Sequence, residues 1–192
     1  MLASGSGTNL QALLDTPEVR PHIALVVSDN PDARALTRAR GHDVAVATVR
    51  WADHDGREPF SEALADAVEA SGAKGVVLAG FMRILGPGFI SRFPDRILNI
   101  HPSLLPAFPG SHAVESALDS GVEVTGVTVH FVDDKVDNGP IVAQAPVQVH
   151  PGDDVATLHG RIQAEEHRLY PRIVRAFVEG RLELSEGEVV MR

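Results

Sequence analysis

The sequence predicts an α/β fold built on an open, mostly parallel sheet with an antiparallel edge and helices on both faces. Three observations predict it. Short apolar runs alternate with helical patterns over the first two thirds of the chain, as in parallel sheets covered on both faces. A glycine-rich loop directly precedes the first helical pattern. Two long strand patterns and one long helical pattern then follow in the last third.

The strands and helices of the first half follow from apolar runs and their boundaries. We expect a helix beginning at Pro31, with Asn30 as its cap and Gly41 as its stop, and a second helix over 57–71 ended by Gly72. Between and around these helices the sequence predicts strands at 23–28, 43–49, 74–80 and 96–100. Only three residues precede the serine of "SGSG", so we expect the first strand to be truncated or very short.

The last third has a different pattern. Strand patterns at 122–132 and 140–149 flank a turn that contains Asp137-Asn138-Gly139, which favours an antiparallel pair at one edge of the sheet. A long helix is expected from near Asp153 to about Glu179.

Length and composition narrow the classes of function. The 192 residues favour a single domain, and 44% hydrophobic with 22% charged residues is typical of a globular protein. The chain has no cysteine, no signal-peptide pattern and no run of 18 apolar residues, so we expect a cytoplasmic protein that does not contact a membrane. A net charge of −9 argues against nucleic acid as a partner. We therefore expect small-molecule substrates and a monomer or homodimer.

The glycine loop predicts an anion site. Gly5 and Gly7 precede a helix whose apolar face carries Leu10, Leu13 and Leu14, and backbone N–H groups at such a helix start bind phosphate. The dinucleotide-binding fingerprint requires a third glycine at the position where this chain has Leu10. The phosphate loop of nucleotide hydrolases requires a lysine that this loop does not contain. A mononucleotide-sized phosphate site is favoured, and a tight turn with a polar cap is the alternative.

A candidate catalytic pair lies at the end of the strand over 96–100. Asn99 and His101 are two apart, so in an extended chain their side chains point to the same side. Asn99 can donate to a developing oxyanion and His101 can carry a proton near neutral pH, while Pro102 restricts the backbone of His101. The alternative for His101 is a surface or core histidine without a function.

A carboxylate near His101 would complete this set, and "DDKVDNGP" offers three aspartates. Asp133 and Asp134 have the pattern of solvated turn residues, whereas Asp137 can be held inward by the turn. Spacing alone leaves this choice open.

Five segments together resemble the 10-formyltetrahydrofolate-dependent glycinamide ribonucleotide formyltransferases of purine biosynthesis. They are "SGSGTNLQALL", "VVLAGFMRIL", "LNIHPSLLPAFPG", "TGVTVHFVDDKVDNGPIVAQ" and "QAEEHRLYP". The "HPSLLP" element is shared by the wider formyltransferase superfamily, whereas the glycine loop and "EEHRLYP" point to this family. The resemblance implies a Rossmann-like formyltransferase fold over 1–192, with a phosphate-binding half at 1–100 and a folate-binding and C-terminal helix half at 101–192.

The resemblance also implies a reaction and its residues. The amine of N1-(5-phosphoribosyl)glycinamide would attack the formyl carbon of the co-substrate 10-formyltetrahydrofolate, through a tetrahedral intermediate formed directly between the substrates and without a metal. Asn99 and His101 would stabilise the oxyanion and handle protons, and Asp137 would keep the histidine charged.

The substrate-binding residues implied by the resemblance fall into two groups. Gly7, Thr8 and Asn9 would hold the ribonucleotide phosphate, and Glu166 would bind its ribose or glycinamide portion. The folate would be bound by Arg57, Met82, Arg83, Ile84, Leu85 and Asn99. Without the resemblance, Glu166 lies on the apolar stripe of the last helix, which includes Val155, and is either a helix-edge carboxylate or a ligand. Arg57 alone would be a solvated charge, and Ile84 and Leu85 ordinary core.

Other functions remain as alternatives. A formyltetrahydrofolate hydrolase would be expected to carry an extra N-terminal domain, and a methionyl-tRNA formyltransferase a basic C-terminal one. A non-catalytic nucleotide-binding module would explain the glycine loop but not Asn99 and His101. A metal hydrolase using Asp53, His54 and Asp55 is disfavoured because three adjacent residues rarely face one metal. His130 is given no catalytic role.

Overall fold

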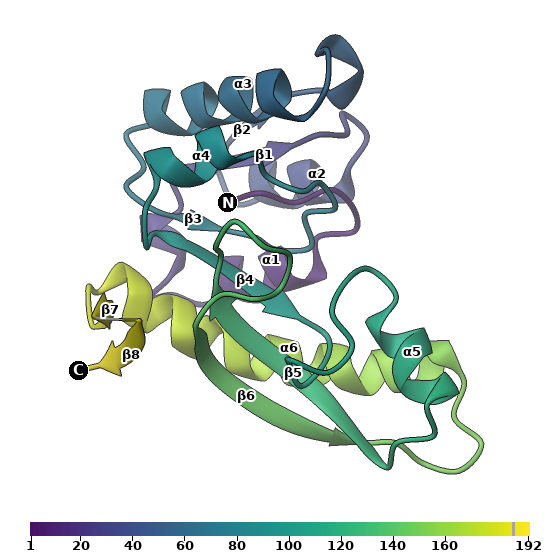
Figure 1. Ribbon diagram of the computed structural model, residues 1–192. Coiled ribbons are helices and arrows are strands. Elements are labelled where there is room, and N and C mark those ends of the chain that lie inside the picture. The colour runs from purple at the N-terminus through teal and green to yellow at the C-terminus, as the bar shows by residue number, and fades with distance from the viewer. Residues whose placement is uncertain (186) are drawn as a thin grey trace. The chain divides into compact units, whose positions relative to one another are not determined.

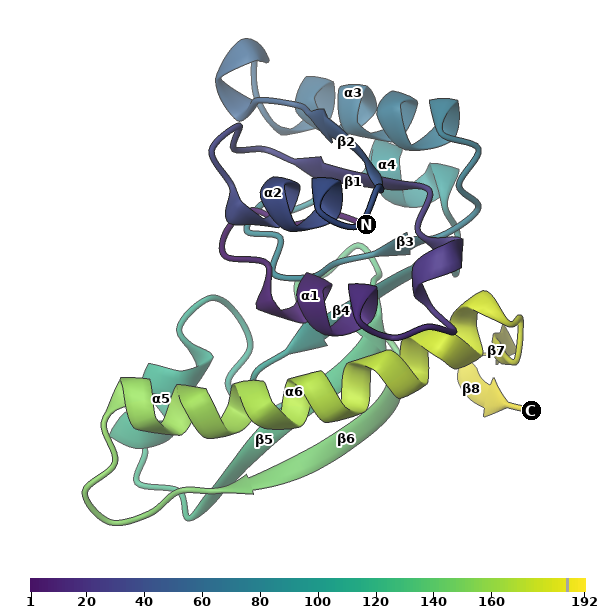
Figure 2. The same cartoon turned by 180° about the vertical axis from the view of Figure 1, so that it is seen from behind.

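The computed structural model describes residues 1–185 and 187–192, and the chain divides into two compact units, Met1–Leu98 and Asn99–Arg192. Figures 1 and 2 show their helices and strands from opposite sides. None of the helices within these described residues is long and apolar enough to cross a membrane.

The first unit is a parallel sheet with helices. Its strands pair in parallel as β1 with β2, where Leu25 lies opposite Ala45, and as β3 with β4, where Val76 lies opposite Ile97. Its elements are α1 (Thr8–Leu14), η1 (Arg20–His22), β1 (Leu25–Ser28), α2 (Arg34–Arg40), β2 (Ala45–Thr48), η2 (Trp51–Asp53), α3 (Arg57–Ala70), β3 (Val76–Val77) and α4 (Pro87–Arg92), and β4 (Ile97–His101) begins in it.

The first residues of the chain lie in the middle of this sheet. Leu2 forms a parallel bridge to Val27, within β1, and another to Leu78, the residue directly after β3. Its N–H donates to the Val77 carbonyl, and the Met1 carbonyl accepts from the N–H of Val27. A strand of a few residues therefore joins β1 to β3 and delivers the chain directly into the glycine loop.

The core of the first unit forms where the sequence pattern places apolar side chains. Leu10, Leu13 and Leu14 of α1 are fully buried, as the 3.6-residue period predicts. On α3, Phe60 and Leu64 are fully buried as well. Burying each such side chain contributes about 1.5–3 kcal/mol, so these helices are held to the sheet mainly by their apolar faces.

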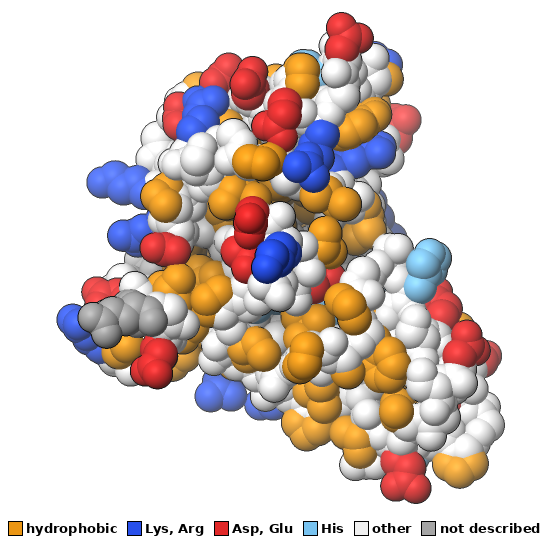
Figure 3. All heavy atoms as spheres, in the orientation of Figure 1, with side chains coloured by type: hydrophobic (Ala, Val, Ile, Leu, Met, Phe, Trp, Pro, Cys, Tyr) orange, Lys and Arg blue, Asp and Glu red, His pale blue; other side chains and the backbone are white. Residues whose placement is uncertain are grey.

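The second unit combines an antiparallel pair with one long helix. Strands β5 (Val124–Phe131) and β6 (Ile141–Gln148) pair antiparallel, with a register shift between Val129 and His130. Helix α6 (Val155–Val178) packs on both strands, as Figure 2 shows. The unit also contains α5 (Ala113–Asp119) and an antiparallel hairpin of β7 (Leu182–Ser185) and β8 (Glu188–Met191). Figure 3 shows hydrophobic side chains gathered on the face of this unit that carries β5 and β6.

Most predicted elements are confirmed, and three details are not. The helix expected from Pro31 begins instead at Arg34 after the cap residue Ala33, although it does end at Gly41. Asn30 is not its cap, because the Asn30 side chain accepts the N–H of Asp32 and closes a local turn before the helix. The short helices α4 and α5 and the β7–β8 hairpin were not predicted, since elements of four to seven residues hold too little periodicity to detect.

Helix α6 shows how its sequence specifies a start and a buried face. The Asp154 side chain accepts the N–H of Thr157 at 2.7 Å and caps the helix. Val155, expected on the apolar stripe, is 41% exposed, because it lies in the first turn. From Leu158 onward the stripe is buried as predicted, and Glu166 lies within it.

Candidate active site

The end of β4 carries the candidate catalytic pair in the second unit. Asn99 is half-buried and His101 is buried, and they are separated by Ile100 in extended backbone, so both side chains lie on one side of the strand. The predicted arrangement of an amide and an imidazole two residues apart is therefore what the structure has.

His101 is held between two hydrogen-bond acceptors. Its Nδ1 lies 3.3 Å from Oδ2 of Asp137, and its Nε2 lies 2.8 Å from the carbonyl oxygen of Phe108. A neutral imidazole donates from one nitrogen only, whereas the charged ring donates from both. Both ring nitrogens of His101 therefore face an oxygen that can accept a proton.

Asp137 is the carboxylate that completes this set. Its side chain is 11% exposed, and it lies in the left-handed region at φ 51°, so the turn directs it inward as expected. The N–H of Gly110 donates to its Oδ2 at 2.8 Å. Burial raises the pKa of Asp137, but the approach of His130, the Gly110 hydrogen bond and the charge of His101 outweigh burial and hold that pKa below its usual value. Asp137 is thus kept as an anion beside His101.

His130 joins the same cluster, although the sequence assigned it no role. It is buried, its Nδ1 lies 2.8 Å from the carbonyl oxygen of Phe131, and its Nε2 lies 3.2 Å from Nδ2 of Asn99. The contact at Nε2 orients the Asn99 amide beside His130. His130 also lies 3.6 Å from Asp137 Oδ1. The signal that could have found it is a histidine inside a strand whose residues are apolar on both sides of it.

The loop after His101 is held by side chains of β5 and β6. Oγ1 of Thr128 donates to the Ser103 carbonyl at 2.7 Å and accepts the N–H of Leu105 at 3.0 Å. Gln144 donates to the Leu105 carbonyl and to Thr128 Oγ1, at 2.8 and 2.9 Å. The loop therefore depends on these bonds as well as on its prolines, and it brings the Phe108 carbonyl and the Gly110 N–H to the cluster.

The glycine loop lies in the first unit and is shaped by its backbone. Gly7 precedes α1 at φ 67°, and a Cβ there would lie 2.8 Å from the backbone of Ala35, so only glycine fits. The N–H of Ala35 donates to the Gly5 carbonyl at 3.1 Å, and Arg38 Nε donates to the Ser6 carbonyl at 2.8 Å. Arg38 therefore brings a cation to the backbone of the loop.

Thr8 and Asn9, the other predicted phosphate residues, form the first turn of α1. Thr8 is half-buried and Asn9 is buried at 8% exposure. Gly7 therefore caps this helix, and Thr8 and Asn9 begin it.

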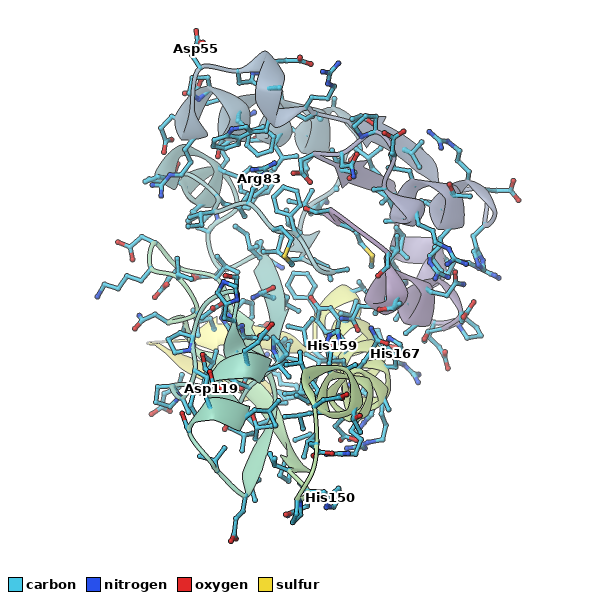
Figure 4. All side chains as sticks on the ribbon, turned by 90° about the vertical axis from the view of Figure 1, so that its right-hand side faces the viewer. Asp55, Arg83, Asp119, His150, His159 and His167 are labelled. Carbon is cyan, nitrogen blue, oxygen red and sulfur yellow. The ribbon has the colours of Figure 1, made fainter. Side chains whose placement is uncertain are left out.

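The predicted folate residues of the first unit differ in exposure. Met82 and Ile84 are 69% and 56% exposed, whereas Leu85 is buried. Arg83, labelled in Figure 4, is held by Asp29, with 2.7 Å between its Nε and Oδ2, and its guanidinium lies 5.1 Å from the centre of the Trp51 ring. The core interpretation is therefore correct for Leu85 and wrong for Ile84.

Arg57 and Glu166 lie on helices of different units. Arg57 is exposed at the start of α3 and only loosely paired with Glu58, at 3.7 Å. Glu166 is 5% exposed on the buried face of α6, not at a helix edge. Burial raises the pKa of Tyr170 one turn later, and the charge of Glu166 raises it further. A carboxylate buried on an apolar stripe is unusual enough to mark Glu166 as a candidate ligand.

The residues considered for a metal do not form a centre. Figure 4 shows Asp55 projecting away from the rest of the first unit, and the His54 ring packs against Phe60 with 6.0 Å between ring centres. Within 1–185 and 187–192, no group of three or more histidine or carboxylate side chains could hold a metal ion.

Comparisons with known proteins identify the family of this chain. Residues 1–174 match the family described as formyl transferase. The phosphoribosylglycinamide formyltransferase of Mycobacterium tuberculosis (strain H37Rv) is 52% identical over 178 residues, which cover 92% of this chain and 82% of that protein. The enzyme of the same name from Escherichia coli (strain K12) is 42% identical over 190 residues, covering 97% of this chain and 90% of that protein.

Solved structures give the same result. The structure of glycinamide ribonucleotide transformylase 1 from Symbiobacterium toebii has a TM-score of 0.93 and 49% identity, covering 99% of this chain and 91% of that chain. The phosphoribosylglycinamide formyltransferase of Anaplasma phagocytophilum has a TM-score of 0.90 and 36% identity, with coverage of 99% and 91%. Through this match and the relatives above, the chain belongs to the formyl transferase family and, within it, to the phosphoribosylglycinamide formyltransferases.

Proposed function

We propose that this protein transfers the formyl group of 10-formyltetrahydrofolate to the amine of N1-(5-phosphoribosyl)glycinamide in de novo purine biosynthesis. The family supports the reaction class, and one observation of this chain carries the proposal. His101 is held with acceptors at both nitrogens, Asp137 and the Phe108 carbonyl, beside the amide of Asn99. Such a set can stabilise an oxyanion and move protons, which is what direct formyl transfer between two substrates requires.

The attack of the amine places negative charge on the formyl oxygen. The Nδ2 of Asn99 is a donor for this oxyanion: one of its contacts is the 3.2 Å approach to His130, and the other, to Asp137 Oδ1, is long at 3.5 Å. The long bond is weak, so the amide can give it up and donate to the oxyanion instead. His130 meanwhile keeps the amide oriented.

The second requirement is a proton balance. A bond forms between the amine nitrogen and the formyl carbon, the bond from that carbon to N10 of the folate breaks, and one proton passes from the amine to N10. The charged His101 stabilises the intermediate and mediates this transfer, and Asp137 supports the charge on the ring. No protein nucleophile and no metal takes part.

The remaining predicted residues bind the two substrates. Gly7, Thr8 and Asn9 hold the phosphate with main-chain and side-chain donors, and Glu166 accepts hydrogen bonds from the ribose or glycinamide portion. In the first unit, segment 82–85 is proposed to bind the folate and Arg57 its anionic part, since this arginine is exposed and loosely paired. In the second unit, Asn99 is the residue proposed for the folate. We propose a cytoplasmic enzyme, monomeric or homodimeric, with small molecules as its substrates.

The test is an absorbance assay with 10-formyltetrahydrofolate as donor, run with and without the glycinamide ribonucleotide. Loss of the formyl group that depends on the ribonucleotide is the expected result. Equal loss without the ribonucleotide would instead make the protein a formyltetrahydrofolate hydrolase. The formylated ribonucleotide is identified by mass spectrometry, so that transfer is measured directly.

A further inference from the structure

Segment 81–85 lies between β3 and α4 in the first unit, has no regular secondary structure and is exposed at residues 82–84. Met82 and Ile84 are among the most exposed apolar side chains of the described residues. A segment of this kind has no strand or helix to fix its peptide groups, so other contacts must hold them. Its orientation is important because its backbone would meet the folate.

Ser4, the first residue of the glycine loop, supplies two of these contacts. Its N–H donates to the Gly80 carbonyl at 3.0 Å, and its Oγ accepts the N–H of Met82 at 2.9 Å. Ser4 therefore bonds both the Gly80 carbonyl and the Met82 N–H, one on each side of Phe81. The hydroxyl fixes the peptide between Phe81 and Met82, which is the entry to the exposed segment.

The rest of the glycine loop is held from a different side. Gly5 and Ser6 accept from Ala35 and Arg38 of α2, through their carbonyl groups. Removing the Ser4 hydroxyl leaves these bonds in place, and it also leaves the bond from the Ser4 N–H. The change would be confined to the Met82 N–H, which would lose its acceptor.

We infer that Ser4 is a positioning residue of the folate site: through its hydroxyl, the loop that binds the ribonucleotide phosphate also fixes the backbone that binds the co-substrate. The inference rests on the proposed function, because segment 82–85 is a folate site only within it. A free Met82 N–H allows the 81–82 peptide to rotate, and the folate must then select one orientation from several, which weakens its binding.

The variant Ser4→Ala tests this role by steady-state kinetics. We expect the KM for 10-formyltetrahydrofolate to rise roughly fivefold, the change that one backbone hydrogen bond typically produces. The KM for the ribonucleotide and kcat should each change less than about twofold, because the phosphate loop and the catalytic cluster keep their own bonds. Ser4→Thr retains a hydroxyl and should restore the folate KM.

A matched control is Ser71→Ala. Ser71 also uses its Oγ to accept a backbone N–H, that of Ala73 at 3.3 Å, but it lies at the end of α3 away from both loops. This variant should leave both KM values unchanged. Thermal unfolding of all three variants then separates a loss of stability from a loss of binding. A Ser4→Ala protein with a lower Tm but an unchanged folate KM would overturn the inference.

Equilibrium binding separates the inference from the proposed function. Trp51 is the only tryptophan and lies against Arg83 of the segment, so its fluorescence reports a non-reactive 10-formyl folate analogue. If the wild type shows no ribonucleotide-dependent transfer, the proposed function fails, yet a weaker analogue affinity in Ser4→Ala would still support the role of Ser4. Equal affinity in wild type and Ser4→Ala contradicts it.

Discussion

The candidate sites of the two units are built from different chemical groups. In the first unit, the candidate phosphate site is made of main-chain groups, and the Arg38 side chain acts on it by holding the backbone at the Ser6 carbonyl. In the second unit, the candidate catalytic centre is made of side chains, and main-chain groups such as the Phe108 carbonyl and the Gly110 N–H hold those side chains.

The difference teaches which substitutions each region tolerates. A site of main-chain donors depends on backbone conformation, so it is sensitive to the loss of glycine and to the residues that hold the loop. A site of side chains depends on chemical identity, so it fails when one functional group is removed even if the backbone is unchanged. The four predictions below test this contrast, from the largest expected effect to the smallest.

Removing a functional group from the second unit should give the largest effect. We expect His101→Ala and Asn99→Ala each to lower kcat by about 10²–10³, because each removes a group that acts on the developing charge. Steady-state kinetics at saturating substrates measures this. His159→Ala is the control, since His159 is exposed on α6, as Figure 4 shows, and its loss should leave kcat unchanged. Near wild-type turnover in either active-site variant would contradict the proposed roles.

Changing the backbone of the glycine loop should give the next effect. Gly7→Ala places a Cβ 2.8 Å from Ala35 at a positive φ, so we expect a loss of stability of about 1–3 kcal/mol and a tenfold or greater rise in the ribonucleotide KM. Urea unfolding and kinetics measure the two quantities. The matched control is Gly160→Ala on α6, where the added Cβ meets no atom within 4 Å and stability should instead rise by about 0.5–1 kcal/mol.

Arg38→Ala should weaken only the ribonucleotide site. Arg38 donates to the Ser6 carbonyl and, through a second nitrogen, to Oε1 of Gln11 at 2.9 Å. We expect a three- to tenfold rise in the ribonucleotide KM, roughly the effect of one exposed charged hydrogen bond, with the folate KM unchanged. Arg40→Ala, on the same helix and exposed, is the control. An equal rise of both KM values would mean that the loop is held as one piece, and that Ser4 and Arg38 do not act separately.

The charge of Asp137 should appear as a pH dependence of stability. Because its folded pKa lies below the unfolded value of about 3.9, the ionised carboxylate stabilises the fold above that pH, and this contribution is lost as pH falls through the folded pKa. Asp137→Asn should therefore lower Tm at pH 7 by a few degrees, and the gap to wild type should shrink below about pH 4. A gap that stays constant from pH 7 to pH 3 would show that the carboxylate acts by shape alone.

The sequence predicted those parts of the fold and the site that depend on residues close together in the chain. The spacing of apolar residues along the sequence predicted the alternation of strands and helices, the antiparallel pair and the buried face of α6. The spacing of two between Asn99 and His101 predicted that their side chains lie on the same side of the strand. Spacing left the choice among the three aspartates open. The resemblance singled out Asp137, whose Oδ2 lies 3.3 Å from Nδ1 of His101. The Asn30 cap was wrong because a side chain that can cap a helix can equally close a turn before it.

The sequence did not predict contacts between residues that are far apart in the chain. His130 meets Asn99 across 31 positions, and Ser4 meets Met82 across 78. Nothing in the residue types marks these pairs, because a buried histidine on a strand and a serine before a glycine each have several common structural roles. Such residues come together only in the folded structure.

The hydrogen bond from His101 to the Phe108 carbonyl has a consequence for how substrate is recognised. In the proposed reaction His101 acts as an imidazolium, and both of its nitrogens already face an acceptor: Nε2 lies 2.8 Å from the Phe108 carbonyl oxygen and Nδ1 lies 3.3 Å from Oδ2 of Asp137. A substrate oxygen that competes for Nε2 thus exchanges one acceptor for another, and the affinity it gains is only the difference between them. Discrimination then favours the species that bears the most negative charge on that oxygen, which is the tetrahedral adduct and not the planar formyl group.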